Sequence, residues 1–536
     1  MTEPGEVRRR WLAAGLFGST MLPARKAAAD VTPLAGVDAS RATVSFPGAT
    51  TPIPLSDALK ERCSLRSFGA KLDGATDDSA AVARAVAYAR ANNVPVFHPG
   101  GACLMAGEAA EIDTHGVAFV GVGMDDVAYP YGRSGSQFWI TDTARSPFRL
   151  GGGGAFDGLV FFWPNQSNHE DAPLPYPPLF TAAAHARAVD ISIRSCQVTN
   201  AFDFLEVSAP GTVAGGIFIS DCRIFALRNC FHFVTVPEVL MIENNLFSYA
   251  VFRHELLRGA GGGKQAEGKF RLRDYTANQG CWFLLTGDGT PEKASSTVGG
   301  CIIASNNYVL GYRYGIRVQG GFCSIARLTS THFDAVSTVL GVDPGGTLAG
   351  VQILGSLFYS FNAGDPQAAH PAFSIRDPSP DNHGNPVCRL YVTDCEFGFV
   401  SGAIFDIEGV NVSEVKISDC KLTRHAHTAT PGTYHALRIA APNAKLTFSN
   451  NDILPAGRFG TGIRIEAVKW ASVTGNTFEG CAAPIELAGT AGRILLSANL
   501  SSATRGPRSV VGAGTAFVLD AANAWDKPAP PGAATR

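Results

Sequence analysis

The chain has 536 residues, with 44 basic and 46 acidic side chains and a formal net charge of −2. This balance gives the protein no general attraction to nucleic acid or to an anionic membrane, so we expect neither as a partner. Hydrophobic residues make up 46% of the chain and charged residues 17%, and there are 59 glycines and 32 prolines. The composition excludes a globally disordered chain and a coiled coil, and it indicates a turn-rich protein with a large core.

The first 29 residues have the layout of an export signal. Arg8, Arg9 and Arg10 precede a short apolar run that begins at Trp11, and small residues at 27–29 supply a cleavage context. The segment resembles a twin-arginine signal and predicts a periplasmic or secreted protein, with a basic disordered tail as the alternative. A polar linker over 30–60 follows. We expect no membrane span, because no later segment has about 18 uninterrupted apolar residues.

The twelve cysteines do not form a disulfide framework. They are spread through the chain without a C-x-x-C pair, and Cys196, Cys222, Cys395 and Cys420 occupy the same point of a repeated pattern. A buried thiol packs there as a small hydrophobic group. Unpaired thiols also agree with folding in the reducing cytoplasm before twin-arginine export.

This pattern recurs about every two dozen residues between residues 190 and 500. Each instance has a strand-like alternation, then Ser, Asp, Asn or Gly, then Cys or Asn; examples begin at Ile191, Phe218, Leu390 and Val415. Such a period without helical spacing is typical of a solenoid whose coils each contain a few strands. The L-x-x-L-x-L spacing of leucine-rich repeats is absent. We therefore predict one all-β solenoid over about 61–520, with a disordered tail at 521–536.

The Cys or Asn position marks a corner of each coil. We expect this residue to adopt a left-handed backbone and to point its short side chain inward. Asn side chains stacked from coil to coil would bond to one another and to turn amides, and Cys would fill the same space by packing.

A second set of alternating strands falls between the corners. The alternation places aliphatic side chains inside and polar ones outside. If the coils stack in register, the outward side chains form one ladder with about 4.8 Å per step. The outward positions are Arg317, Gln319, Arg376, Asp406, Glu408, Arg438, Arg464, Glu466 and Glu486.

The segment from Ser67 to Gly101 predicts an N-terminal cap for the solenoid. Residues 82–89 form an apolar helical stripe, and Thr76 with Asp77 supplies N-cap oxygens. A short helix of this kind covers the strand edges and core that an open solenoid end exposes.

The motif F-G-A-K-x-D-G-x-T-D-D-S with a downstream V-x-F-H-P-G resembles the rhamnogalacturonase/epimerase-type domain of the pectate-lyase-like superfamily, which many phage tailspikes share. The resemblance implies a right-handed parallel β-helix and, usually, action on polysaccharide. It leaves the chemistry open, because the motif is a structural cap and members include hydrolases, lyases, epimerases and non-catalytic proteins. The sequence lacks the Gly-His-Gly of polygalacturonase-like hydrolases, the Asp-Pro-His of mannuronan epimerases and a calcium-pectate-lyase set.

Asp406 and Glu408 are the candidates for glycoside hydrolysis. They lie two residues apart on one predicted strand, so both point outward about 6.5–7 Å apart along the backbone. That separation borders the range for inverting enzymes, in which one carboxyl protonates the leaving oxygen and the other activates water. The alternative is a solvated strand face whose carboxylates pair with arginines on adjacent coils.

Outward arginines and Gln319 are the candidates for substrate binding. Guanidinium forks suit the carboxylates of uronic acids, and in a β-elimination one would stabilise the charge that develops after proton removal. In such a metal-independent lyase, His254 and Tyr275 would move protons. The alternatives are a structural ladder of arginines with acidic side chains and an ordered loop around His254. The arginines are Arg317, Arg376, Arg438 and Arg464.

The sequence thus favours an exported carbohydrate-active protein that binds and cleaves an acidic polysaccharide, as a glycoside hydrolase or a polysaccharide lyase. A non-catalytic polysaccharide-binding or surface-structural β-helix is the alternative. The sequence requires no cofactor and shows no metal-binding set, and calcium is compatible with the lyase interpretation. Both a monomer and a homotrimer agree with the pattern.

Overall fold

The structure is a computed structural model in which the chain divides into two units, residues 1–59 and 60–536. In the first unit it describes the antiparallel strands β1 (Thr43–Val44) and β2 (Ile53–Pro54). The described ranges of the second unit are 63–107, 111–123, 135–166, 173–182, 187–209, 211–234, 237–248, 271–287, 300–320, 322–323, 325–361, 369–380, 387–423, 434–454, 459–481, 483–502, 509–511, 517–521 and 523–524. The predicted signal and His254 lie outside the described residues.

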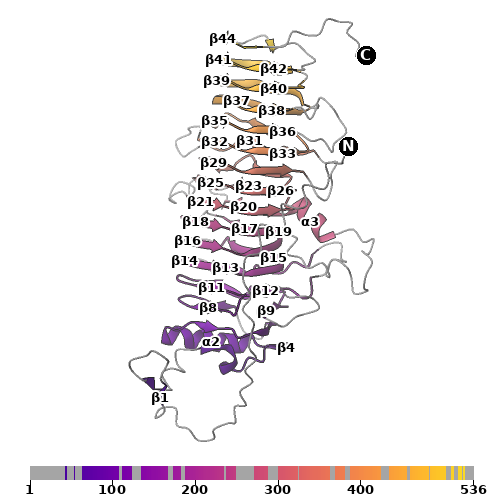
Figure 1. The fold of residues 1–536 in the computed structure, drawn as a ribbon. Coiled ribbons are helices and arrows are strands. Elements are labelled where there is room, and N and C mark those ends of the chain that lie inside the picture. The colour runs from indigo at the N-terminus through magenta and orange to yellow at the C-terminus, as the bar shows by residue number, and fades with distance from the viewer. Residues whose placement is uncertain are drawn as a thin grey trace, which may run out of the picture. The chain divides into compact units, whose positions relative to one another are not determined.

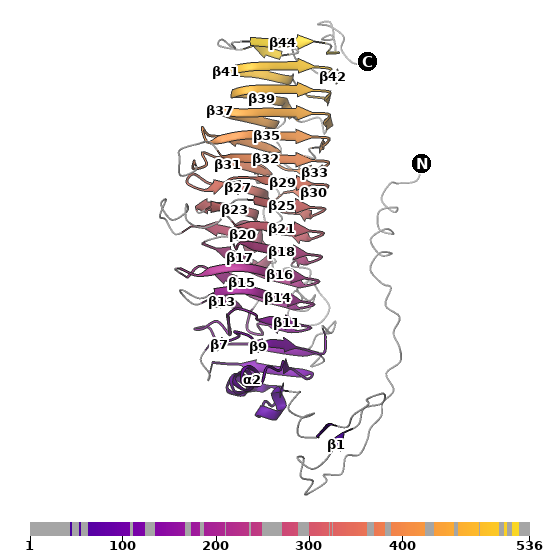
Figure 2. The same cartoon turned by 90° about the vertical axis from the view of Figure 1, so that its left-hand side faces the viewer.

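The second unit is a right-handed parallel β-helix, which confirms the predicted fold. Each coil passes through three strand positions, and each strand pairs in parallel with its counterpart on the next coil. The coils therefore stack along one axis, as Figure 1 and Figure 2 show from two sides. We name the three resulting sheets the first, second and third faces, in the order in which a coil meets them.

The strands of each face follow one another from coil to coil, and five long strands bend between two faces. The first face contains β3 (Cys63–Ser64), β5 (Val96–Phe97), β8 (Ala118–Val120), β11 (Ala155–Asp157), β14 (Arg187–Arg194), β16 (Val213–Ser220), β18 (Val239–Glu243), β21 (Cys301–Ser305), β25 (Ile325–Thr329), β29 (Val351–Leu354), β32 (Cys388–Thr393), β35 (Val412–Ser418), the later parts of β37 (Tyr434–Ser449), β39 (Phe459–Thr474) and β41 (Ala483–Ser497), and β44 (Phe517–Ala521).

The second face contains β4 (Asp73–Asp77), β6 (Gly101–Met105), β9 (Ser136–Ile140), β12 (Val160–Phe162), the earlier parts of β15 (Gln197–Val207) and β17 (Arg223–Phe233), β19 (Leu246–Ser248), β22 (Tyr308–Leu310), β26 (His332–Asp334), β30 (Leu357–Ser360), β33 (Glu396–Val400), β36 (Lys421–Thr423), β38 (Asp452–Leu454), β40 (Thr477–Glu479) and β42 (Leu500–Ser502).

The third face contains β7 (Ile112–Asp113), β10 (Phe148–Leu150), β13 (Phe180–Ala182), the later parts of β15 and β17, β20 (Cys281–Thr286), β23 (Tyr314–Gly320), β27 (Thr338–Val342), β31 (Phe373–Arg376), β34 (Phe405–Glu408), the earlier parts of β37, β39 and β41, and β43 (Ser509–Val511). A separate parallel pair joins β24 (Phe322–Cys323) to β28 (Thr347–Leu348).

Inward side chains from the three faces fill the interior of the coil stack. Alternate positions are buried in many strands, such as β14 and β16, while β15 and β27 are buried at nearly every position. Equivalent aromatic side chains stack from coil to coil. Phe231 lies on Phe283 and Phe358 on Phe397, with ring centroids 4.6 Å apart in both pairs. Because every coil buries its apolar side chains against its neighbours, the stack has one continuous core.

The Asn and Cys corners are aligned, as the repeat predicts. Asn451 Nδ2 donates to Asn476 Oδ1 at 3.0 Å, and Asn476 Nδ2 donates to Asn499 Oδ1 at 2.9 Å. The Cys222 amide donates to Asn245 Oδ1 at 2.8 Å, so thiols and amides share one ladder. Its members from coil to coil include Cys196, Cys222, Asn245, Asn307, Cys395, Cys420, Asn451, Asn476 and Asn499.

The backbone of these corners differs from the expectation in one respect. The left-handed residue is the one before the Cys or Asn, so the prediction that the Cys or Asn itself is left-handed is wrong. The left-handed residue turns the backbone at the corner, and the side chain of the following Cys or Asn then points inward. Asn, Asp, Ser and Gly precede the corner because short polar side chains and glycine tolerate this backbone best. Examples are Ser195, Asp221, Asn244, Asp394, Asp419, Asn450 and Gly475.

Helix α2 (Ser79–Asn92) packs on the N-terminal coils, next to the short helix η1 (Leu65–Phe68). The predicted apolar stripe at residues 82–89 is buried, and its alanines and valines join the core of the coil stack. Among the described residues, no helix has both the length and the apolar character needed to cross a membrane.

The acidic motif before α2 holds the cap in place. Asp78 accepts the backbone amides of residues 71 and 72 at 2.7 and 2.9 Å, and Asp77 Oδ1 accepts the Ser79 amide at 2.9 Å. The Thr76 hydroxyl instead donates to Asp73 at 3.0 Å, and the N-cap residue of α2 is Asp78. The N-cap position predicted for Thr76 and Asp77 is therefore wrong, although Asp77 still accepts the amide of the first helical residue. The motif shared with the resembling family therefore has a structural function here.

The twelve cysteines are all free thiols, and all but Cys301 are buried. Burial raises the pKa of Cys281, Cys323 and Cys388 to about 12, and the thiolate is the reactive form. We expect iodoacetamide to label Cys301 first in the native protein and all twelve thiols in denaturant, as mass spectrometry would measure. Native labelling of Cys281 before Cys301 would contradict the buried ladder and core.

Candidate functional site

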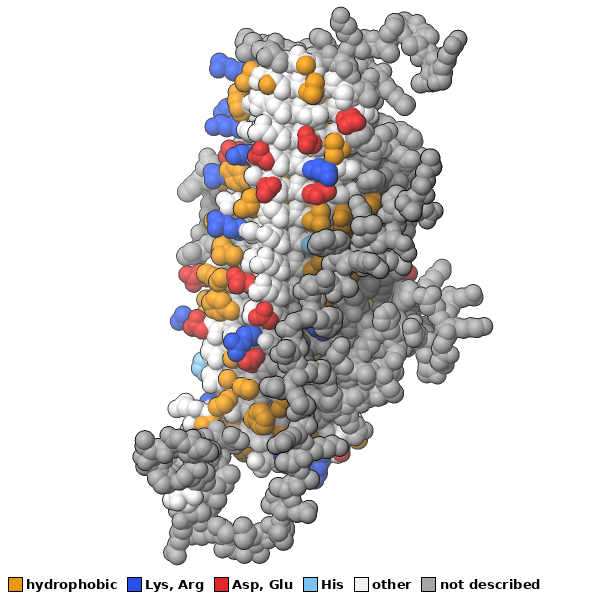
Figure 3. Space-filling model, viewed as in Figure 1, with side chains coloured by type: hydrophobic (Ala, Val, Ile, Leu, Met, Phe, Trp, Pro, Cys, Tyr) orange, Lys and Arg blue, Asp and Glu red, His pale blue; other side chains and the backbone are white. Residues whose placement is uncertain are grey.

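Outward side chains of the third face form the predicted ladder. The strand register places Arg317 beside Gly341, Gly341 beside Ser374, and Ser374 beside Asp406. Asp406 then lies beside Arg438, as Arg438 does beside Arg464 and Arg464 beside Glu486. These residues therefore lie side by side on consecutive strands, although loops separate them in the sequence. Figure 3 views the coil stack from the side of the first and second faces, where basic and acidic side chains also lie along the C-terminal coils.

Asp406 and Glu408 lie between two arginines. Arg376 donates to Asp406 Oδ2 and lies with Nη1 2.7 Å from Glu408 Oε2. Arg438 Nη1 donates to Asp406 Oδ1 at 2.8 Å and to Glu408 Oε2 at 3.0 Å. Both oxygens of Asp406 therefore accept from guanidinium groups, and its side chain is 15% exposed.

This arrangement brings the two carboxylates closer than the strand spacing suggests. Because one Arg438 nitrogen binds an oxygen of each, those oxygens are no more than about 6 Å apart, which is nearer the separation of retaining than of inverting glycosidases. The cause is that both side chains lean toward the same guanidinium group.

The ion-pair network continues toward the C-terminus. Arg438 Nη2 donates to Glu466 Oε2 at 2.8 Å, Arg464 Nε donates to Glu466 Oε1 at 2.9 Å, and Arg464 Nη1 lies 3.4 Å from Glu486. Burial lowers the pKa of Arg438, but its hydrogen bonds to the carboxylates outweigh this effect and the net shift is upward. Glu466 is the reverse case: burial raises its pKa, and the two arginines outweigh burial and lower it.

Arg317 and Gln319 belong to the same face but not to this network. Arg317 pairs with Asp343 at 2.9 Å and lies over the Tyr314 ring, 4.5 Å from its centroid. Three coil steps, about 14 Å, separate Arg317 from Asp406 along the axis. Gln319 is exposed at the end of β23. The structure thus joins Arg376, Arg438 and Arg464 to the carboxylates and leaves Arg317 apart.

Tyr275 lies on α3 (Arg271–Gln279), which packs against β17. Its ring is half-buried against Phe202, with centroids 6.4 Å apart, and burial raises the pKa of Tyr275. Four strands of the third face separate β17 from the strand of Asp406, so Tyr275 and Asp406 do not share one centre. His254 cannot be placed, because it lies outside the described residues.

A cluster that the sequence analysis missed lies beside Tyr275. Asp203, whose side chain is fully buried, accepts three hydrogen bonds from Arg228, including Nε to Oδ1 at 3.0 Å. The Asn229 amide and Nδ2 also donate to Asp203, both at 3.0 Å. Arg228 in turn lies over the Phe202 ring at 4.5 Å. Burial raises the pKa of Asp203 above its ordinary value, although the Arg228 guanidinium opposes this.

Glu206 and His232 form a second pair on the neighbouring outward positions. His232 Nδ1 lies 3.4 Å from Glu206, and His232 Nε2 is 3.1 Å from the Thr286 hydroxyl. The hydrogen bond with His232 lowers the pKa of Glu206, and the Ser208 hydroxyl acts in the same direction against burial. The alternation Phe231, His232, Phe233 is the signal that could have placed His232 outside.

We expect acid to weaken the fold through Glu206 and Glu466. A carboxyl whose pKa is lower in the folded state adds stability above its unfolded pKa of about 4.3, and this is lost as pH falls through the folded pKa. The urea midpoint should therefore fall as pH drops below about 4.5. Glu466→Gln should flatten this dependence, whereas the surface control Glu396→Gln should not. An equal change in both variants would contradict the assignment.

No group of three or more His, Cys, Asp or Glu side chains in the described ranges could hold a metal ion.

Neither a protein-family model nor a curated protein matches this sequence. Among solved structures, the tailspike protein of E. coli bacteriophage HK620 in complex with a pentasaccharide is similar with a TM-score of 0.50 at 12% identity, over 90% of this chain and 82% of the tailspike. The catalytic unit of a thermostable α-1,3-glucanase from Streptomyces thermodiastaticus is similar with a TM-score of 0.41 at 12% identity, over 91% of this chain and 71% of the glucanase. The tailspike similarity supports the β-helix fold alone.

Proposed function

We propose that the protein is an exported carbohydrate-active β-helix protein that binds and cleaves an acidic polysaccharide. The observation that carries the proposal is the row of guanidinium groups and carboxylates on consecutive coils of the third face. Charged side chains recur from coil to coil along the axis of the β-helix. Such a row suits a polymer whose charged groups recur along its length. The fold similarity to a tailspike solved with a pentasaccharide supports a saccharide as that polymer. The cap motif supports a pectate-lyase-like relationship.

Asp406 and Glu408 are the proposed catalytic pair. At their separation one carboxylate attacks the sugar and the other supplies a proton to the leaving oxygen, as in retaining glycosidases. The carboxylates of an acidic substrate compete for Arg376 and Arg438, which frees an oxygen of Asp406 for this role.

A non-catalytic polysaccharide-binding protein is the second candidate. It is favoured by one observation, that both oxygens of Asp406 already accept hydrogen bonds from arginines. In that case the ladder serves to hold the coils and bind the polymer. A lyase that uses an arginine with His254 or Tyr275 is less well supported, because Tyr275 lies beside Arg228 and apart from Asp406.

A screen of acidic polysaccharides tests the proposal. New reducing ends without ultraviolet absorbance of an unsaturated product indicate hydrolysis, and such absorbance indicates a lyase. We expect Asp406→Asn and Glu408→Gln to lower the rate of reducing-end release at least about 100-fold, while Glu396→Gln leaves it unchanged. Undiminished turnover in Asp406→Asn would reject the catalytic pair. Binding without any cleavage would favour the non-catalytic candidate.

A further inference from the structure

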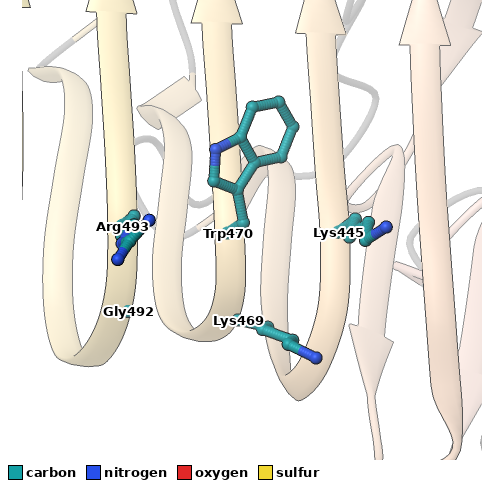
Figure 4. Close-up of a pocket in the computed structure, with 5 residues that line it drawn as sticks. All are labelled: Lys445, Lys469, Trp470, Gly492 and Arg493. Carbon is teal, nitrogen blue, oxygen red and sulfur yellow. The ribbon is translucent and has the colours of Figure 1, made fainter.

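A second polar surface, on the first face, surrounds an exposed tryptophan. Lys445, Lys469, Trp470, Gly492 and Arg493 line an open hollow of about 650 Å³, which we name the Trp470 patch (Figure 4). The indole is 36% exposed, whereas Trp163 and Trp282 are fully buried. A volume of this size lies within the range typical of small-ligand sites.

The coil register builds the Trp470 patch. Lys445 on β37 pairs with Trp470 on β39, and Trp470 pairs with Arg493 on β41. A cation therefore lies one coil, about 4.8 Å, to either side of the indole, and Lys469 lies at the adjoining bend. Gly492 keeps this bend closely packed, because a Cβ there would lie 2.3 Å from the Lys469 carbonyl oxygen.

The three cations differ from the arginines of the third face, which are bound in ion pairs. Within the described part of the chain, no ion pair joins Lys445, Lys469 or Arg493 to a carboxylate. Glu414 lies beside Lys445 in register, but its carboxylate accepts from the Tyr391 hydroxyl at 2.7 Å. The patch thus combines an aromatic face with positive charge that is not bound in any ion pair between described residues. Figure 4 shows the indole leaning from its strand toward the strand of Lys445.

We propose that the Trp470 patch binds a carboxylate-bearing sugar unit of the polysaccharide, which rests on the proposed function of the protein. The apolar face of a sugar ring packs on the indole, and its carboxylate receives charge-assisted hydrogen bonds from the flanking cations. None of the five described residues that line the patch is an acid or a histidine, so we assign the patch to holding the chain and not to cleaving it. It lies on the first face and the Asp406 pair on the third, which makes the patch a separate anchoring site.

Titration of the full chain with oligogalacturonate and with a neutral cello-oligosaccharide tests this inference, followed by indole fluorescence and calorimetry. We expect the acidic oligosaccharide to bind more tightly, Trp470→Ala to weaken its binding about tenfold or more, and Trp470→Tyr to restore most of it. Lys445→Gln combined with Arg493→Gln should also weaken binding and reduce its salt dependence. Leu354→Ala and Arg327→Gln, at exposed positions of the same face, are the controls.

The outcomes separate the two proposals. Unchanged binding in the patch variants, with binding to polysaccharide retained, would overturn the Trp470 patch and leave the proposed function intact. Equal affinity for the neutral oligosaccharide would overturn the acidic specificity. The patch variants could instead lose binding to duplex DNA or to an acidic protein while they still bind the saccharide. That result would show that the patch does not bind a sugar. Absence of saccharide binding by the wild-type chain would reject both proposals.

Discussion

Replacing Arg228 by methionine is expected to lower the free energy of unfolding by about 3–5 kcal/mol at neutral pH. The Asp203 carboxylate is fully buried and takes most of its compensation from this guanidinium group. Methionine retains much of the packing volume over Phe202 but leaves the charge without its partner. The two hydrogen bonds from Asn229 remain, so we expect a destabilised fold and not an unfolded chain. Urea and thermal denaturation of both proteins would measure the change.

The pH dependence gives Arg228→Met a second signature. Burial already raises the pKa of Asp203, and loss of the guanidinium raises it further. A carboxyl whose pKa is raised on folding contributes stability that is present below its unfolded pKa of about 3.9 and lost as pH rises through the folded pKa. The variant should therefore gain stability on going from pH 8 to pH 5, relative to wild type.

Arg194→Met is the matched control for this prediction. Arg194 also pairs with an aspartate, Asp157, but both side chains are largely exposed, at 59% and 36%. Its loss should cost much less than the loss of Arg228, because solvent screens an exposed ion pair. Equal costs in the two variants, or no pH dependence in Arg228→Met, would show that Arg228 does not compensate a buried charge on Asp203.

The features that the sequence predicted well are those that repeat. The period of the Cys and Asn corners placed side chains from distant parts of the sequence in one ladder, because each coil has to turn at the same point. The alternation around Asp406, Arg438 and Arg464 similarly gave their outward direction. Neither pattern depends on the length of the loops between the coils.

The features that were missed depend on where strands bend. Asp203 lies in the run Phe202, Asp203, Phe204, where alternation gives no reason for a buried carboxylate, and the strand pairing around it contains a register shift. Only the position of Arg228 on the next coil explains it. The guanidinium group that Asp406 and Glu408 share was equally hidden, since it depends on both carboxylates leaning toward Arg438.

Asn476→Ala is expected to lower the free energy of unfolding by about 2–5 kcal/mol, because it interrupts the corner ladder. Asn476 Oδ1 accepts from the amide and Nδ2 of Asn451, at 2.9 and 3.0 Å, and its own Nδ2 donates to the Phe448 carbonyl at 2.9 Å. All these groups are buried, so removing the side chain leaves donors and an acceptor without partners in a place that water does not reach. Denaturant midpoints of the two proteins would measure the loss.

Asn476→Cys provides the sharper comparison. The thiol occupies this corner on four other coils, where the Cys196 amide donates to Cys222 Sγ at 3.4 Å, so a sulfur can take over part of the acceptor role. We expect Cys to be less destabilising than Ala at position 476, and Asp452→Ala, at an exposed position next to the ladder, to have little effect. If Ala and Cys were equally costly, small size alone would govern the corner. If Asn476→Ala left the free energy of unfolding unchanged, the hydrogen bonds between coils would not stabilise the β-helix. Its stability would then come from packing of the apolar core.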